Sequence, residues 1–487
     1  MTLKLNQPDL FRDRAFINGQ WVQANKLRLF PVFNPSTGAT IGSVPDLGAD
    51  ETRIAIDAAE KALKPWQALT AKERSILLRN WFNLILTHQD DLATIMTSEQ
   101  GKPFAEAKGE VAYGASFVEW FAEEAKRIYG DVIPAHGPDK RLVTIKQPIG
   151  VVAAITPWNF PIAMITRKVA PALAAGCTVV IKPGEDTPLC ALALAELSLQ
   201  AGIPAGVLNV VTTLQAPEVG RTLCEDSRVR KLSFTGSTPV GKLLMRQCAD
   251  TVKKVSLELG GNAPFIVFDD ADLDSAIAGL MASKFRNAGQ TCVCTNRILV
   301  QDGIHDLFIE KLNTAVHNLT VGDGFGEAVN IGPLINDKAV NKVHGLVEEA
   351  LAKGAKITQQ NTAVPDHSNF YPPTVLTGVT TSMSIATEEI FGPVATVFRF
   401  SEESEAVALA NDTPFGLAAY FYSRDIGRVW RVAEALEFGM VGINEGIIST
   451  EVAPFGGIKE SGIGREGSRY GIDDFVEIKY LCMGGIR

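Results

Sequence analysis

The sequence predicts an α/β fold built around a doubly wound parallel sheet. From residue 149 onward, short apolar runs such as IGVVAAIT, CTVVIKP and GVLNVVT alternate with amphipathic stretches. This repeated alternation is typical of βα units. The apolar runs are almost continuous, as expected for parallel strands that are buried on both faces. We therefore expect residues 149–258 to form an open, doubly wound sheet.

A second α/β unit is predicted after the first. The chain has 487 residues, which is longer than a single hydrophobic core usually supports. Near residue 260 the strand-like run NAPFIVF is followed by DDADLDSAIAGLMASKF, where Asp270 or Asp272 can cap a helix. This second unit leads directly to the segment FRNAGQTCVC.

The remaining elements flank these two units. Residues 51–130 are rich in helix signals, and in ADETRIAIDAAEKALKPW we expect Asp50 to cap the first helix with Glu51 in its first turn. Residues 130–150 indicate two strands around a Gly-Pro turn, and residues 473–485 indicate another strand.

Composition excludes several classes of protein. The net charge is −9 and no long basic cluster is present, so we expect no nucleic-acid partner. No apolar run is long enough to cross a bilayer, and the first residues lack the apolar region of a signal peptide. Seven cysteines without zinc spacing predict free thiols, no metal site and a reducing, cytoplasmic location.

One cysteine and one glutamate stand in segments that favour chemistry. Cys292 lies in FRNAGQTCVC, and a thiol is the most nucleophilic side chain available at neutral pH. Glu258 lies in LELGG, where apolar neighbours can raise the pKa of its carboxyl toward 7 for work as a general base. Free cysteines are otherwise mostly small buried hydrophobes, which is the interpretation for Cys177, Cys190, Cys224, Cys248 and Cys482.

Taken together, the motifs resemble those of the aldehyde dehydrogenase superfamily. They are FINGQW, TPWNFP, IKPGEDTP, FTGS, LELGG, FRNAGQTCVC, EEIFGP and PFGGIKESGIGRE, in this order over nearly the whole chain. The resemblance implies a Rossmann-like NAD(P)-binding domain (residues 1–126 and 147–258) and an α/β catalytic domain (259–466). It also implies a small β oligomerisation arm and tail (127–146 and 467–487), and hence a homo-oligomer, either a dimer or a tetramer.

The resemblance also assigns the catalytic roles. It implies that the Cys292 thiolate adds to an aldehyde, and that the side-chain amide of Asn159 and the backbone N–H of Cys292 hold the resulting oxyanion. Hydride transfer then leaves a thioester, which water hydrolyses with Glu258 as the base. The six histidines all lie outside the recognised motifs, which disfavours a Cys-His hydrolase.

The expected cofactor site departs from the usual dinucleotide fingerprint. No GxGxxG follows the strand expected at 150–155, but GSTPVG opens a helix whose N-terminus can receive a pyrophosphate. We expect NAD as the cofactor, with NADP as the alternative, because the Glu185 carboxylate accepts a bond from a ribose 2′-OH and repels a 2′-phosphate. The cofactor-binding residues implied by the resemblance are Trp158, Lys182, Glu185, Gly236, Ser237, Gly241, Leu259, Glu389 and Phe391.

Two arginines indicate a small-molecule aldehyde that carries a carboxylate. Arg286 lies six residues before Cys292, and Arg167 lies eight residues after Asn159. A guanidinium suits a carboxylate best because it binds in a bidentate fashion. The surrounding segments resemble succinate-semialdehyde dehydrogenases, in which the positions matching Arg167, Arg286 and Ser449 hold the substrate carboxylate. Glutarate semialdehyde differs by one methylene, which discriminates only weakly, so it stays an alternative together with a broader aldehyde specificity.

Three further hypotheses remain at this stage. Cys292 and Glu258 could serve a thiol esterase or hydrolase without a redox cofactor. The chain could be a catalytically silent, structural member of the fold, although intact Cys292, Glu258 and Asn159 argue against that. Finally, Cys294 is a candidate redox partner of Cys292, since a short and strained disulfide between them would be labile.

Overall fold

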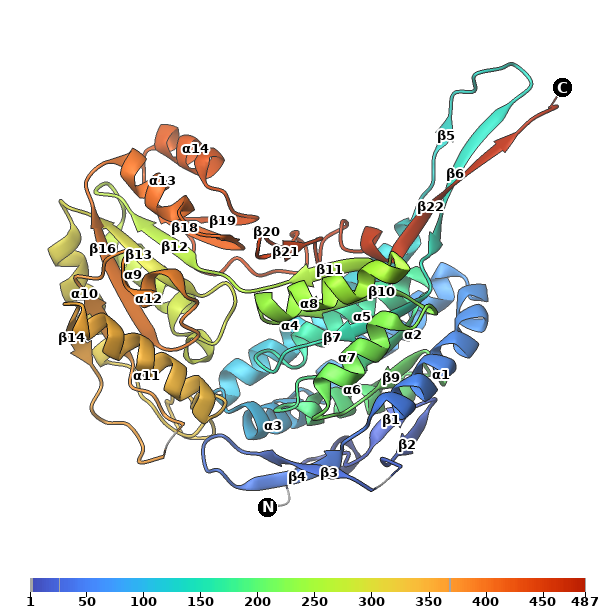
Figure 1. Ribbon diagram of the computed structural model, residues 1–487, viewed down its shortest axis with the longest axis horizontal. Helices are drawn as coiled ribbons and strands as arrows, with labels where there is room; N and C mark the ends of the chain where they lie inside the picture. The colour runs from blue at the N-terminus through green and yellow to red at the C-terminus, as the bar shows by residue number, and fades with distance from the viewer. Residues whose placement is uncertain (1–2, 26, 368, 487) are drawn as a thin grey trace.

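Two large sheets and a projecting ribbon organise the computed structural model, which describes residues 3–25, 27–367 and 369–486. Figure 1 shows one sheet in each half of the molecule, with the ribbon extending from one end. The α/β fold with a doubly wound first unit is therefore confirmed.

The first sheet has eight strands, and its five central strands are parallel. Its order is β2(Gln20–Val22)-β1(Ala15–Ile17)-β9(Leu208–Val210)-β8(Thr178–Lys182)-β7(Val151–Ile155)-β10(Val229–Thr235)-β11(Lys254–Glu258)-β21(Gly462–Ile463). The strand order reverses between β7 and β10, and ligands of open α/β sheets bind at the carboxyl ends of strands at such a point. The edge strands β1, β2 and β21 are antiparallel additions, and β21 comes from residues after the second sheet.

Helices cover both faces of the first sheet. One face carries α2(Ala71–Thr87), α3(Gln89–Gln100), α4(Phe104–Glu124), α5(Ala163–Ala175) and α6(Pro188–Gln200), and the other carries α1(Ala49–Ala68), α7(Ala216–Glu225) and α8(Thr238–Cys248). Their apolar residues form two separate cores on the two faces of the sheet. Such burial on both faces explains why the central strands are continuously apolar.

The predicted cap of the first helix was wrong. The N-cap of α1 is Gly48, and the Glu51 side chain accepts a hydrogen bond from the Gly48 N–H at 2.9 Å. Asp50 instead lies inside the first turn and pairs with Arg53 on the surface. The Glu51 carboxylate also accepts from Asn25 N, so burial of this acid fixes where the helix begins.

The second sheet has seven strands in the order β14(Lys356–Gln360)-β15(Thr374–Thr377)-β16(Val394–Phe400)-β13(Thr295–Gln301)-β12(Ala263–Val267)-β18(Ala418–Tyr422)-β19(Met440–Ile443). Its helices are α9(Leu273–Lys284), α10(His305–His317), α11(Asp337–Ala352), α12(Ser384–Thr387), α13(Glu403–Asn411) and α14(Ile426–Ala435). Asp272 caps α9 by accepting from Ser275 N at 3.0 Å, whereas Asp270 accepts bonds from the Ser423–Asp425 segment.

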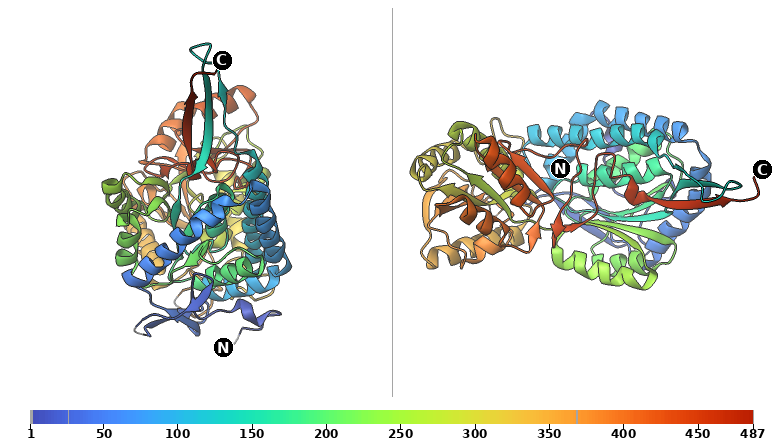
Figure 2. Two further views of the ribbon diagram at one scale, coloured as in Figure 1. Left: turned by 90° about the vertical axis from the view of Figure 1, so that its right-hand side faces the viewer. Right: turned by 90° about the horizontal axis from the view of Figure 1, so that it is seen from above.

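The ribbon consists of β5(Val132–Ile133), β6(Arg141–Pro148) and β22(Val476–Met483), as expected from the strand signals at 130–150 and 473–485. β6 and β22 pair antiparallel over their full length. Figures 1 and 2 show that they project away from the rest of the molecule, and Val132, Ile478 and Tyr480 are exposed on them. The use of this ribbon in oligomerisation and the exact domain boundaries remain predictions.

Two short antiparallel pairs complete the sheets: the hairpin of β3(Leu29–Phe33) with β4(Thr40–Pro45), and the non-local pair of β17(Phe415–Gly416) with β20(Ile458–Lys459). Across the described residues, none of the helices combines the length and apolar character that a bilayer crossing needs.

Candidate active site

A cavity of about 350 Å³ opens at the carboxyl ends of β7, β10 and β11, where the first sheet faces the second. Eight of the residues singled out in the sequence line it: Trp158, Asn159, Gly236, Ser237, Leu259, Cys292, Glu389 and Phe391. Trp158 and Phe391 meet edge to face, with ring centroids 5.6 Å apart. The motifs are thus brought together although they are spread over more than 230 positions of the chain.

Other residues of this wall were missed by sequence reasoning. They are Pro157, Thr235, Gly260, Lys338, Ala339, Lys342 and Ile390. Most are direct neighbours of motif residues. Lys338 and Lys342 lie on α11, and no motif marks that helix, so only the packing of α11 against the EEIFGP segment reveals them. There the Lys342 ammonium donates to the Glu389 carbonyl at 2.6 Å.

The backbone before Cys292 has an unusual conformation. Asn287, Ala288 and Gly289 all have positive φ angles, of 52°, 54° and 76°. Such angles are disfavoured for residues with a side chain and persist where the surroundings impose them. A Cβ on Gly289 would collide with the Gly392 carbonyl oxygen. A glycine is therefore required at position 289, both by the φ angle and by the nearby Gly392 carbonyl oxygen.

Buried hydrogen bonds hold this loop. The Asn287 amide donates to the Asn159 carbonyl at 2.9 Å, and its side-chain oxygen accepts from Gln100 at 2.9 Å. The Asn287 backbone N–H donates to Glu106, also at 2.9 Å. On the other side, Lys102 donates to the same Asn159 carbonyl. The segments that contain Cys292 and Asn159 are thus fixed to one another by buried and partly buried polar groups.

The Asn159 side chain lies against the nucleophile loop. Its Nδ2 donates to the Gln290 carbonyl at 3.1 Å, which leaves the second N–H of this amide for another acceptor. The residue is 3% exposed and also lines the cavity. This position is compatible with the donor role that the sequence suggested for Asn159.

The Cys292 thiol is protonated at rest. Burial raises its pKa to about 12, and the nearby carboxylates of Glu389 and Glu258 act in the same direction. The positive charges of Arg167 and Arg286 oppose this shift. The thiol therefore needs a base, or added positive charge, before it becomes a nucleophile.

Glu258 ends β11 and is buried in the interior. Neither of its carboxylate oxygens has a hydrogen-bond partner within the described part of the chain. Burial, and then the negative charge of Glu466, raise the pKa of this carboxyl well above its ordinary value, while Arg167 and Lys168 lower it. This direction makes the carboxylate form of Glu258 a stronger proton acceptor than an ordinary carboxylate.

The glycines of LELGG make room for the site. A Cβ on Gly261 would lie 2.6 Å from the Cys292 carbonyl oxygen, and one on Gly260 would lie 3.1 Å from the Glu389 carboxylate. Gly261 N also donates to Glu389 at 3.3 Å. Burial raises the pKa of Glu389 to about 7. Strand β11 thus passes close to both the nucleophile and the cavity acid.

None of the three predicted substrate residues, Arg167, Arg286 and Ser449, is among the residues that line the cavity. The Arg167 guanidinium is sandwiched between Phe455, 3.9 Å from the ring centroid, and Phe117, at 5.3 Å. Its Nε lies 2.6 Å from a Glu466 carboxylate oxygen, whose partner oxygen accepts from Lys168. Arg286 lies over the Phe160 ring at 5.2 Å. Ser449 is half-buried in the loop after β19.

Three cofactor candidates lie outside the cavity. The Lys182 ammonium pairs with Glu185 at 2.7 Å, and Glu185 lines a separate hollow of about 490 Å³ together with Asp186 and His367. Gly241 lies on α8, where any Cβ would run into the Leu259 side chain. Its absence of a side chain therefore lets α8 pack closely on the segment after β11.

Cys294 points into the protein. The residue is 7% exposed, and its thiol donates to the carbonyls of Lys284 and Thr295, both at 3.4 Å. A redox link between Cys292 and Cys294 stays a prediction.

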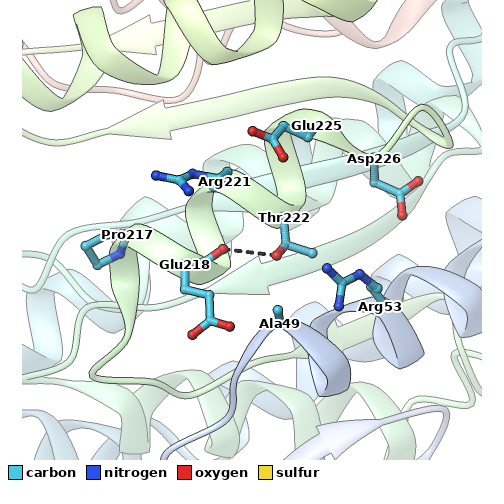
Figure 3. A pocket seen from close by; sticks show the side chains of 8 residues that line it. All are labelled: Ala49, Arg53, Pro217, Glu218, Arg221, Thr222, Glu225 and Asp226. Atoms are coloured by element: carbon cyan, nitrogen blue, oxygen red, sulfur yellow. Dashed lines mark hydrogen bonds between the residues drawn. The ribbon is translucent and has the colours of Figure 1, made fainter.

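A different, more open hollow of about 540 Å³ lies between α1 and α7 (Figure 3). Its wall consists of Ala49, Arg53, Pro217, Glu218, Arg221, Thr222, Glu225 and Asp226. It contains no nucleophile and no aromatic side chain, and the Thr222 hydroxyl is already used by the Glu218 carbonyl at 3.0 Å. The chemistry of this protein is therefore expected in the Cys292 cavity.

Comparison with known proteins decides the family. The model of the aldehyde dehydrogenase family matches residues 21–481. This chain belongs to the aldehyde dehydrogenase family. It is 64% identical to succinate-semialdehyde dehydrogenase [NADP(+)] GabD of Escherichia coli (strain K12), over 99% of this chain and 100% of that protein. It is 63% identical to glutarate-semialdehyde dehydrogenase of Pseudomonas putida, with the same coverage.

A solved relative agrees with the fold. The crystal structure of succinate-semialdehyde dehydrogenase from Burkholderia pseudomallei superposes with a TM-score of 0.98, at 59% identity, over 99% of this chain and 100% of the other.

Within the described residues, no group of three or more histidine, cysteine, aspartate or glutamate side chains could hold a metal ion.

The strained loop gives a first prediction. Gly289→Ala should lower the melting temperature and reduce aldehyde oxidation at least about tenfold, because the new Cβ meets a carbonyl at a φ that costs on the order of 1–3 kcal/mol. The matched control is Gly345→Ala, on an exposed face of α11 with open space around it, which should stabilise by about 1 kcal/mol. Equal melting temperatures for the two variants would contradict the role of the loop.

Proposed function

We propose that this aldehyde dehydrogenase oxidises succinate semialdehyde to succinate with NAD(P). The observation that supports a carboxylated substrate is the placement of two arginines, since the charges of both Arg167 and Arg286 act on the Cys292 thiol. An aldehyde bound at this thiol with a distal carboxylate can reach the same arginines. The names of the relatives at 64% and 59% identity agree with this substrate.

The chemistry follows from the cavity residues. The Cys292 thiol gives up its proton to water and its sulfur bonds to the aldehyde carbon, which produces an oxyanion that the free N–H of Asn159 and the backbone N–H of Cys292 stabilise. After oxidation, a thioester to Cys292 remains. The Glu258 carboxylate removes a proton from a water molecule, whose oxygen attacks the thioester carbon and releases the acid and the thiol.

The residues present fit a dinucleotide. Helix α8 begins beside the cavity with Ser237 as N-cap, and the Ser237 side chain makes no capping bond, so the free N–H groups of the first turn suit a pyrophosphate. Glu389 and Phe391 would hold the nicotinamide ribose, and Trp158 would face the phosphates together with Ser237. When bound, the nicotinamide supplies the acceptor for the hydride of the substrate.

We further propose that Glu185 favours NAD. The Glu185 side chain is 47% exposed, and its pKa is lowered because the Lys182 ammonium opposes the effect of burial, so it is charged at neutral pH. The ion pair offsets part of this negative charge, and the positive charge of Lys338 acts on Glu185 as well. These cations weaken the repulsion of a 2′-phosphate by Glu185 but do not remove it. Because the Escherichia coli relative is named for NADP(+), the assay with both cofactors tests this proposal.

Two alternatives differ in the class of substrate or reaction. Glutarate semialdehyde is the substrate named for the Pseudomonas putida relative at 63% identity. A thiol esterase would use Cys292 and Glu258 alone. A steady-state comparison of succinate semialdehyde, glutarate semialdehyde and butanal, each with NAD and NADP, separates these functions, and product formation without a dinucleotide would identify the esterase.

The division of labour between thiol and carboxylate can be tested directly. Cys292→Ser should abolish oxidation of succinate semialdehyde, whereas Glu258→Gln should release about one NADH per active site in a burst and then stall at the thioester. Stopped-flow absorbance at 340 nm together with intact-protein mass measures both. Sustained turnover by either variant at neutral pH would sink the assignment.

Replacement of Glu185 by serine should move the ratio of kcat/KM for NAD over NADP toward NADP by about tenfold, or about 1.4 kcal/mol. The reason is that the substitution removes the carboxylate that repels a 2′-phosphate, while the positive charges of Lys182 and Lys338 remain. The ratio is measured at fixed, saturating succinate semialdehyde. An unchanged ratio would show that this carboxylate does not select the cofactor.

Loss of Arg286 should harm carboxylated aldehydes selectively. We expect Arg286→Ala to lower kcat/KM for succinate semialdehyde about 100-fold, since a buried carboxylate without its partner costs several kcal/mol, and to change butanal oxidation by less than about threefold. Arg14→Ala, at an exposed arginine, is the control. An equal loss on both aldehydes would assign Arg286 to structure.

A further inference from the structure

Tyr113 is a half-buried residue with a buried hydroxyl, and the chemistry above does not use it. It lies on α4, and its hydroxyl has no hydrogen-bond partner within the described part of the chain. Its ring packs edge to face on Phe117, with centroids 5.0 Å apart, and against the small apolar cluster that contains Phe160 and Met164. A buried hydroxyl without a partner is costly and calls for an explanation.

The two aromatic neighbours of Tyr113 are also the platforms of the two arginines. Phe117 carries the Arg167 guanidinium at 5.3 Å, and Phe160 carries that of Arg286 at 5.2 Å. Helix α4 can bring Tyr113 to this place because it packs closely on the start of α5, where a Cβ on Gly114 would lie 2.7 Å from Ile162. Tyr113 therefore shares its surroundings with both arginines.

The charges that act on the Tyr113 hydroxyl include those of both arginines and of Cys292. Burial raises the pKa of Tyr113, the charges of Arg167 and Arg286 lower it, and those of Glu466 and Cys292 raise it. The net shift is upward, so the phenol keeps its proton at neutral pH and can donate a hydrogen bond.

A second buried donor in this region is also unsatisfied. Arg167 Nη2 has no hydrogen-bond partner among the described residues, although the opposite side of the guanidinium faces Glu466. The unpaired O–H of Tyr113 and the unpaired N–H of Arg167, which share Phe117 as a neighbour, call for the same kind of partner, an anionic acceptor with more than one oxygen.

We propose that the Tyr113 hydroxyl is a further donor to the distal carboxylate of the substrate, so that Tyr113 determines specificity for ω-carboxylated aldehydes together with Arg167 and Arg286. This inference rests on the proposed function. Unlike a guanidinium, the phenol is neutral, so it contributes a directional hydrogen bond rather than a charge. This hydrogen bond fixes the carboxylate at a defined distance from Cys292.

The test compares Tyr113→Phe with the wild type on succinate semialdehyde and on butanal, which has the same number of carbon atoms and no carboxylate. We expect the KM for succinate semialdehyde to rise about tenfold, as a lost hydrogen bond to a charged group predicts, with kcat within about twofold. Butanal oxidation should change by less than about twofold. Tyr129→Phe, at an exposed tyrosine, is the matched control.

A binding measurement gives a second readout that does not depend on turnover. Succinate should raise the melting temperature of the wild type and of Tyr129→Phe, and should raise that of Tyr113→Phe clearly less. Two results would overturn this inference and leave the proposed function intact. The first is a Tyr113→Phe variant with an unchanged KM and an unchanged rise of the melting temperature with succinate, as expected if water satisfies the hydroxyl. The second is an equal loss of activity on both aldehydes. A wild type that does not prefer succinate semialdehyde to butanal would refute the proposed function and this inference with it.

Discussion

The geometry of the site depends on the left-handed turn at Asn287–Gly289. Three consecutive positive φ angles are unfavourable, so the turn persists only because buried hydrogen bonds to Gln100, Glu106 and the Asn159 carbonyl impose it. These bonds join the first sheet's helices to the loop of the second unit. The nucleophile is thereby held against the Asn159 segment by the same contacts that hold the two halves of the molecule together. The position of Cys292 and the packing of the two halves therefore depend on the same hydrogen bonds.

A second constraint is the balance of buried charge behind the cavity. Glu258 and Glu466 are both buried, and Arg167 and Lys168 from one turn of α5 face Glu466. Burial and the negative charge of Glu466 keep the pKa of the Glu258 carboxyl raised, and Arg167 and Lys168, which face Glu466, lower it only in part. Had Arg167 paired with Glu258 directly, that pKa would be low and the base would be weak. Arg167 therefore acts on the pKa of Glu258 in addition to its proposed contact with the substrate carboxylate.

Sequence reasoning reached the parallel sheet and the cavity residues because both rest on local patterns. Continuous apolar runs reveal doubly buried strands, and the motifs around Cys292, Asn159 and Glu389 lie in loops at strand ends, where parallel strands bring them together. It could not find the caps and partners that depend on distant residues. Gly48 rather than Asp50 caps α1 because Glu51 is buried, and the pairing of Arg167 with Glu466 joins positions almost 300 residues apart. The edge strands from both ends of the chain are non-local for the same reason.

The two arginines also show why residue type alone leaves substrate choice open. A guanidinium accepts any carboxylate, and one methylene more or less in the substrate changes binding by only about 1–3 kcal/mol. Discrimination between four- and five-carbon semialdehydes must therefore come from a rigid distance between the carboxylate and Cys292. The aromatic sandwich of Phe117 and Phe455 around Arg167 supplies such rigidity, since a clamped guanidinium cannot follow a longer substrate. Specificity in this fold is thus set by the packing behind the charged groups.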